Sequence, residues 1–111
     1  MFTFRHLTLE YKDLFDNYLK PYNFVTCEYS FTNLFIWRKA CDTQFTIYDD
    51  ALLIKKKDLN DGYYFIQPIG YNKDNLKTII DNIVEYSIEN NFDYVFKDLE
   101  APFVDLLKEM Y

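Results

Sequence analysis

One short stretch, Gln67-Pro68-Ile69-Gly70-Tyr71-Asn72, stands between a predicted strand and a predicted helix, where a phosphate group could bind. Backbone N–H groups at a helix N-terminus can hold a pyrophosphate, because they point outward and the helix dipole favours negative charge. However, Pro68 has no N–H group, and Tyr71 stands where close approach of a phosphate would favour a small residue. A structural turn around Gly70 is therefore the favoured interpretation, and a phosphate site is the alternative.

The other reactive side chains are few. His6 is the only histidine, so a catalytic triad or a metal site could draw on one imidazole at most. Its place in a terminal strand favours a structural role. Cys27 and Cys41 are too few for a disulfide framework or a zinc site, and we expect both to be buried thiols in a reducing cytosol.

The stretch from Glu28 to Arg38 is rich in aromatic residues and contains the only tryptophan, Trp37. Read as a helix, it places four residues on one stripe: Phe31, Leu34, Phe35 and Arg38. An arginine on an apolar stripe either pairs with a carboxylate such as Glu28 or extends its charged end to water over the aromatic side chains. The second interpretation is favoured.

Composition excludes several classes of function. The chain has 111 residues, of which 50% are hydrophobic, so it can bury the core of one domain. Its formal net charge of -6 argues against binding to DNA or to an anionic membrane surface, which both require concentrated positive charge. The N-terminus lacks the apolar run of a signal peptide, and no stretch is long enough to span a bilayer. We therefore expect a soluble cytoplasmic protein.

Hydrophobic periodicity predicts nine elements. Helices are predicted over residues 9–19, about 31–40, 74–90 and 102–111. Strands are predicted over residues 2–7, 45–48, 51–57, 63–67 and 93–97. The order β-α-α-β-β-β-α-β-α indicates an α+β fold with a mainly antiparallel sheet covered by helices. We expect its core to contain Leu34, Phe35, Trp37, Ile80, Ile83 and Leu107.

Turn chemistry supports this order. Asp49-Asp50 and the stronger turn signal Asn60-Asp61-Gly62 each separate two of the predicted strands, which makes an antiparallel meander. The helix at residues 74–90 would act as a crossover and place the strand at residues 93–97 parallel to its neighbour.

Four stretches carry a resemblance to a known family: Leu7-Thr8-Leu9-Glu10, Phe31-Thr32-Asn33-Leu34-Phe35-Ile36-Trp37, Gly62-Tyr63-Tyr64-Phe65 and Pro68-Ile69-Gly70. They resemble the N-terminal half of a bacterial family of uncharacterised proteins related to the C-terminal domain of phosphatidylglycerol lysyltransferase. The order of elements is similar to the GCN5-related acyltransferase fold up to its fourth helix. The resemblance implies that residues 1–111 form a single, partial acyltransferase-like domain, the first of two in tandem.

In the resembling fold, a Gln/Arg-x-x-Gly-x-Gly/Ala loop holds the pyrophosphate of acyl-coenzyme A. Gln67 and Gly70 match this pattern, whereas Asn72 replaces the last small residue. The resemblance also places aminoacyl transfer mainly in the second domain. We therefore expect a non-catalytic scaffold or interaction domain without a cofactor. The alternative is a transferase that depends on acyl-coenzyme A or aminoacyl-tRNA and uses residues 67–72 as its donor site.

The strand predicted at residues 93–97 would form an open edge of the sheet. Its three central residues, Tyr94, Val95 and Phe96, carry no charge to discourage pairing with another chain. We expect a homodimer through this edge. The alternatives are a monomer whose last helix covers the edge and, in longer relatives, coverage by a second acyltransferase-like domain.

Overall fold

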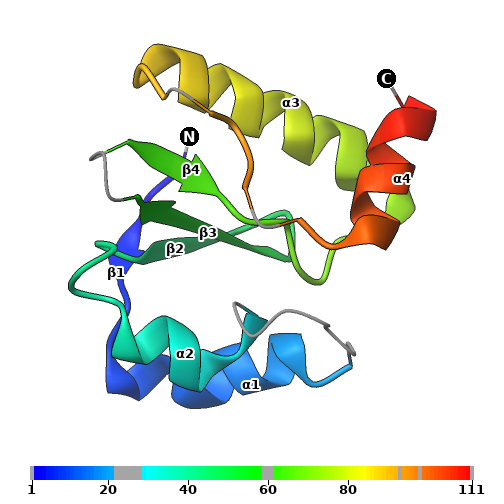
Figure 1. The fold of residues 1–111 in the computed structure, drawn as a ribbon. Coiled ribbons are helices and arrows are strands. Elements are labelled where there is room, and N and C mark those ends of the chain that lie inside the picture. Colours follow the sequence, from blue (N-terminus) through cyan, green and yellow to red (C-terminus); the bar gives the residue numbers. More distant parts are fainter. Residues whose placement is uncertain (1, 22–28, 59–61, 93, 98, 111) are drawn as a thin grey trace.

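The strands form one antiparallel sheet, and helices cover both of its faces (Figure 1). The computed structural model describes residues 2–21, 29–58, 62–92, 94–97 and 99–110. The strands are β1 (Arg5–His6), β2 (Gln44–Tyr48), β3 (Ala51–Lys57) and β4 (Tyr63–Phe65). The helices are the 3-10 turn η1 (Leu9–Tyr11), α1 (Lys12–Leu19), α2 (Phe31–Ile36), α3 (Lys73–Glu89) and α4 (Ala101–Met110). Helices α1 and α2 lie on one face, and α3 and α4 lie on the other.

The sheet has the order β1-β2-β3-β4, so the predicted meander and the α+β class are confirmed. In the β2–β3 hairpin, Tyr48 pairs with Ala51, and the two turn residues Asp49 and Asp50 have φ of 52° and 64°. Two consecutive left-handed residues are typical of a type I′ turn, whose twist matches that of the strands. The other predicted turn, Asn60-Asp61-Gly62, lies largely outside the described residues.

Helix α3 has a strong signal at each end. Asn72 forms a capping box with Asn75 at its start. At its end, Asn91 adopts φ of 59°, its N–H donates to the Ile88 carbonyl at 3.2 Å, and the Phe92 N–H donates to the Ser87 carbonyl at 2.9 Å. These are the two hydrogen bonds of a Schellman motif. The predicted helix at residues 74–90 is confirmed, shifted by one residue at each end.

The predicted strand at residues 93–97 is wrong as a regular element, although its parallel direction is right. Within the described residues, a single parallel bridge joins Phe65 and Phe96. The chain after Phe65 leaves this segment but continues to pair with β3: the Ile66 N–H donates to the Ile54 carbonyl, and Ile69 bridges Leu52. The two segments therefore diverge after one pair. For the same reason β4 ends at Phe65 rather than at residue 67.

The first strand is also shorter than predicted, because only Arg5 and His6 pair with β2. The residues before them pack by their side chains. The rings of Phe2 and Phe4 lie 5.5 and 5.3 Å from the ring of Tyr86 on α3. The N-terminal segment is thus held by aromatic contacts with a helix rather than by a longer ladder.

The buried core lies in two layers on either side of the sheet. The layer under α1 and α2 includes Phe15, Phe31, Leu34, Phe45 and Ile54, and the layer under α3 includes Leu53, Phe65, Ile79 and Ile83. Burial confirms the predictions for Leu34, Ile80 and Ile83, whereas Phe35 and Leu107 are only half-buried.

The prediction that Trp37 is a core residue is wrong, because 54% of its surface is exposed. Helix α2 ends at Ile36 rather than near residue 40, and Trp37 is its C-cap. Phe31 and Leu34 occupy the buried stripe of this helix. Trp37 follows Leu34 by three residues, but its φ of -93° and ψ of 6° are not helical, so the helical stripe ends before it.

Among the described residues, no helix combines the length and the apolar character needed to cross a bilayer.

Candidate functional site

The segment from Gln67 to Asn72 leads from the sheet into α3, as predicted, and its first side chain is buried. Gln67 is 5% exposed. Its N–H donates to the Tyr29 hydroxyl at 3.2 Å, and its Oε1 accepts a hydrogen bond from the Glu100 N–H at 3.1 Å. Gln67 therefore bridges the two segments that diverge after Phe65.

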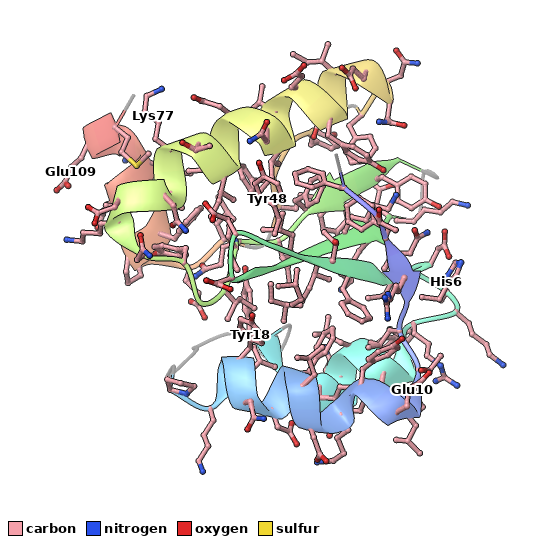
Figure 2. All side chains as sticks on the ribbon, turned by 180° about the vertical axis from the view of Figure 1, so that it is seen from behind. His6, Glu10, Tyr18, Tyr48, Lys77 and Glu109 are labelled. Carbon is pink, nitrogen blue, oxygen red and sulfur yellow. The ribbon has the colours of Figure 1, made fainter. Side chains whose placement is uncertain are left out.

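Gly70 lies directly against an aromatic ring of α1. Its φ is +82°, and a Cβ added there would stand 2.7 Å from two ring carbons of Tyr18. Tyr18 points from α1 toward the sheet (Figure 2), and its hydroxyl donates to the Asp50 carbonyl at 3.0 Å. Burial, together with the negative charge of Asp50, raises the pKa of Tyr18. Glycine at position 70 is thus required by both backbone conformation and lack of space.

Asn72 is the N-cap of α3. Its Oδ1 accepts from the Asn75 N–H at 3.1 Å, while its own N–H donates to Asn75 Oδ1 at 3.2 Å. Asn75 also donates through Nδ2 to the Asp49 carbonyl at 3.1 Å. The residue that departs from the acyltransferase loop pattern therefore fixes the helix start and ties it to the β2–β3 turn.

Most backbone N–H groups of residues 67–72 are not available to bind a ligand. The N–H groups of Gln67, Ile69 and Asn72 donate to Tyr29, to the Leu52 carbonyl and to Asn75. Pro68 has no N–H group. Four of the six positions thus have no backbone donor left for a phosphate.

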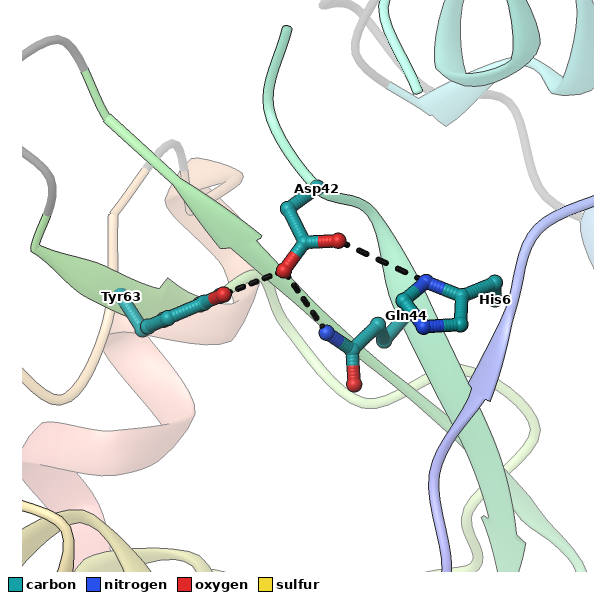
Figure 3. Close-up of polar contacts among 4 residues, drawn as sticks. All are labelled: His6, Asp42, Gln44 and Tyr63. Atoms are coloured by element: carbon teal, nitrogen blue, oxygen red, sulfur yellow. Dashed lines mark hydrogen bonds and ion pairs between the residues drawn. The ribbon is translucent and has the colours of Figure 1, made fainter. Parts of the chain in front are cut away.

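A second polar cluster was not anticipated from the sequence (Figure 3). Asp42 accepts hydrogen bonds from the Tyr63 hydroxyl and, at 2.9 Å, from Gln44 Nε2, and its other oxygen lies 3.4 Å from His6 Nδ1. The four residues come from β1, β2, β4 and the turn before β2. Asp42 has φ of 44°, a conformation that aspartate tolerates better than most residues.

Hydrogen bonding decides the charge state of this cluster. Partial burial alone would raise the pKa of Asp42, but the hydrogen bonds from Tyr63 and Gln44, helped by the nearby His6 and Lys57, lower it below its ordinary value. The carboxylate is therefore held in its charged form. The only sequence signal for the cluster was the spacing of Asp42 and Gln44, which does not point to His6 or Tyr63.

We expect the Tyr63→Phe substitution to raise the pKa of Asp42, because it removes one donor to the carboxylate. In the wild type the folded pKa lies below the unfolded value of about 3.9, so Asp42 stabilises the fold above that pH. This contribution is lost as the pH falls through the lower, folded pKa. Stability of the wild type should therefore fall more steeply between about pH 5 and pH 2 than stability of Tyr63→Phe.

Carboxyl titration by NMR, with urea unfolding at each pH, measures both effects. Tyr94→Phe is the matched control, because it removes the hydroxyl of a tyrosine that is 54% exposed. An Asp42 titration that is the same in Tyr63→Phe and in the wild type would contradict the assignment.

An apolar groove of about 440 Å³ lies between α3, residues 95–96 and α4. It is lined by Ile80, Val84, Val95, Phe96, Val104, Leu107 and Lys108. It therefore adjoins the segment that bridges to β4, on the side of the sheet covered by α3.

The remaining predicted residues have local roles. Arg38 lies 3.7 Å over the ring of Phe35, which is the aromatic contact of the favoured interpretation, and it donates to the Phe35 carbonyl at 2.7 Å. Its alternative partner Glu28 lies outside the described residues, as does Cys27.

Cys41 is a half-buried free thiol. Within the described part of the chain, no three His, Cys, Asp or Glu side chains are grouped to hold a metal ion.

A family model described as the C-terminal part of phosphatidylglycerol lysyltransferase matches residues 19–111. This chain belongs to that family. The match supports the relation that the sequence motifs indicated. No curated protein matches this chain.

Among solved structures, this member of the lysyltransferase C-terminal family is similar to a conserved protein of unknown function from Bacteroides thetaiotaomicron VPI-5482. The TM-score is 0.77 and the sequence identity is 26%. The similarity covers 86% of this chain but only 31% of the Bacteroides chain. The matched region thus spans less than a third of the length of the Bacteroides chain.

Proposed function

We propose that this chain is a non-catalytic acyltransferase-like domain that serves as a scaffold or interaction module. The observation that carries the proposal is the use of backbone donors in residues 67–72. Three N–H groups are engaged inside the chain, and Pro68 provides none. A loop that holds a pyrophosphate needs these donors to point at the ligand.

The surroundings of the loop support the same proposal. The Gln67 side chain accepts a hydrogen bond from the Glu100 N–H. The ring of Tyr18 leaves no room for a Cβ at Gly70. Both residues that match the loop pattern thus have structural partners.

The alternative function is acyl or aminoacyl transfer from acyl-coenzyme A or aminoacyl-tRNA, with Gln67, Gly70 and Asn72 at the donor site. Membership in a lysyltransferase-related family favours it. The net charge of -6 disfavours a tRNA substrate, because tRNA binding depends on neutralising phosphates.

A second acyltransferase-like domain is the partner that we propose for this module in longer relatives. The Bacteroides neighbour supports this, because more than two thirds of its chain lies outside the similarity. The scaffold role would then consist in supporting the domain that carries the chemistry.

Acetyl-coenzyme A is expected to leave the melting temperature unchanged. A ligand present at about 100 times its Kd stabilises a protein by about 2.7 kcal/mol. For a domain of this size such a change raises the melting temperature by about 10 °C or more. Thermal unfolding with up to ~1 mM acetyl-coenzyme A therefore detects any Kd well below that concentration.

Pantetheine, which lacks the pyrophosphate, is the matched ligand control. A saturable rise with acetyl-coenzyme A that is absent with pantetheine and is lost in Gly70→Val would overturn the proposal in favour of the transferase alternative.

A further inference from the structure

The segment around Phe96 is an unfinished edge of the sheet. On its inner side, the Val95 carbonyl accepts from the Phe65 N–H at 2.8 Å, and the Lys97 N–H donates to the Phe65 carbonyl at 3.0 Å. Because backbone groups alternate in direction along an extended segment, the N–H and the carbonyl of Phe96 point away from β4. Neither group has a hydrogen-bond partner among the described residues.

We infer that a second copy of this chain pairs with this edge, Phe96 against Phe96, in an antiparallel two-fold arrangement. In an antiparallel ladder, two directly opposed residues can exchange both of their N–H···O bonds. A two-fold axis beside Phe96 would satisfy its two outward groups in both copies at once, and isologous contacts of this kind are the commonest in dimers. The inference extends the interaction role proposed above and supplies its partner.

The usual protection of an edge is weakened here. A lysine next to an open edge normally discourages pairing, because a partner strand would bury its charge. Lys97, however, lies 3.9 Å from Asp58 and near the ring of Tyr64, at 5.1 Å, on β4. Asp58 thereby compensates part of its charge, so Lys97 opposes pairing less than an unpaired lysine would, although its side chain is 44% exposed.

The apolar groove beside the edge favours the same occupant. A partner segment placed along residues 95–97 would also cover the adjoining side chains of α3 and α4. The segment that the second copy brings, Tyr94-Val95-Phe96, is uncharged, and Tyr94 is 54% exposed in the isolated chain. Dimerisation would therefore remove apolar surface from water in addition to pairing the backbone.

The proposed register makes a charge-specific prediction. With Phe96 opposite Phe96, Val95 of each copy lies opposite Lys97 of the other, as a close, non-hydrogen-bonded pair. Val95→Lys would place like charges opposite each other, whereas Val95→Glu would place opposite charges there. We expect Val95→Lys to raise the Kd of the dimer at least about tenfold relative to Val95→Glu.

Sedimentation equilibrium over a wide concentration range measures these constants, and circular dichroism confirms that both variants are folded. Leu9→Lys is the control, because Leu9 is 62% exposed and belongs to η1, on the sheet face that α1 and α2 cover. Its dimer constant should equal that of the wild type. In the wild type, exchange of the Phe96 amide hydrogen should slow as protein concentration rises, which requires no substitution.

A monomer at the highest concentration would overturn the inference and leave the edge to a partner of different sequence. A dimer with equal constants for Val95→Lys and Val95→Glu and an unprotected Phe96 amide would also overturn it. Neither result bears on the proposed lack of a donor site, which acetyl-coenzyme A binding tests separately.

Discussion

Replacing Phe65 with alanine should remove a large part of the stability of this fold. Phe65 is fully buried, and its ring lies 5.9 to 6.0 Å from the rings of Phe4, Tyr86 and Phe92. Truncating a buried phenylalanine costs about 3–5 kcal/mol, because apolar contacts are lost and a cavity remains. The total free energy of unfolding of such a domain is about 5–15 kcal/mol, so the loss would be severe. Urea unfolding measures it.

Trp37→Ala is the informative comparison, since it removes the larger side chain. Trp37 is 54% exposed, so its truncation should change the free energy of unfolding by no more than about 1 kcal/mol. A loss comparable to that of Phe65→Ala would show that Trp37 is covered in solution and would contradict the position described for it.

Gly70→Ala is expected to have the second largest effect. A left-handed conformation costs a residue with a Cβ about 1–2 kcal/mol. The added methyl group would also meet the ring of Tyr18 at 2.7 Å, and overpacking of this kind costs a further ~1–3 kcal/mol. The two contributions can be separated by a double-mutant cycle with Tyr18→Leu.

Tyr18→Leu removes the ring and should relieve the steric part in Gly70→Ala while leaving the conformational part. Urea unfolding of the four proteins measures the coupling. If Gly70→Ala alone were as stable as the wild type, the close contact between Gly70 and Tyr18 would not exist in solution.

The features that the sequence could predict are those decided by neighbouring residues. The ends of α3 follow from Asn72 and Asn91, and the β2–β3 hairpin follows from Asp49-Asp50 between two apolar runs. In each case the chemistry that determines the element lies within a few residues of it. Such elements were predicted to within a residue or two.

The features that the sequence could not predict depend on partners that are far apart in the chain. The length of the last extended segment was decided by Ile66 and Ile69, which pair with β3 instead of continuing beside residue 96. The position of residues 67–72 was predicted, but the roles of Gln67 and Gly70 depend on Glu100 and Tyr18, which are far away in the sequence. The Asp42 cluster was missed for the same reason.

The packing of the N-terminal rings has a consequence for how the chain folds as it is made. Phe2 packs against Tyr48 and Phe4 against Phe65, and both rings also contact Tyr86 on α3, far along the chain. A ribosome releases the N-terminus first, at about 5–20 residues per second. For several seconds after their synthesis these two rings therefore lack the part of their native surroundings that α3 supplies, whereas the β2–β3 hairpin can close as soon as it emerges. The first residues to be synthesised are among the last to complete their native contacts.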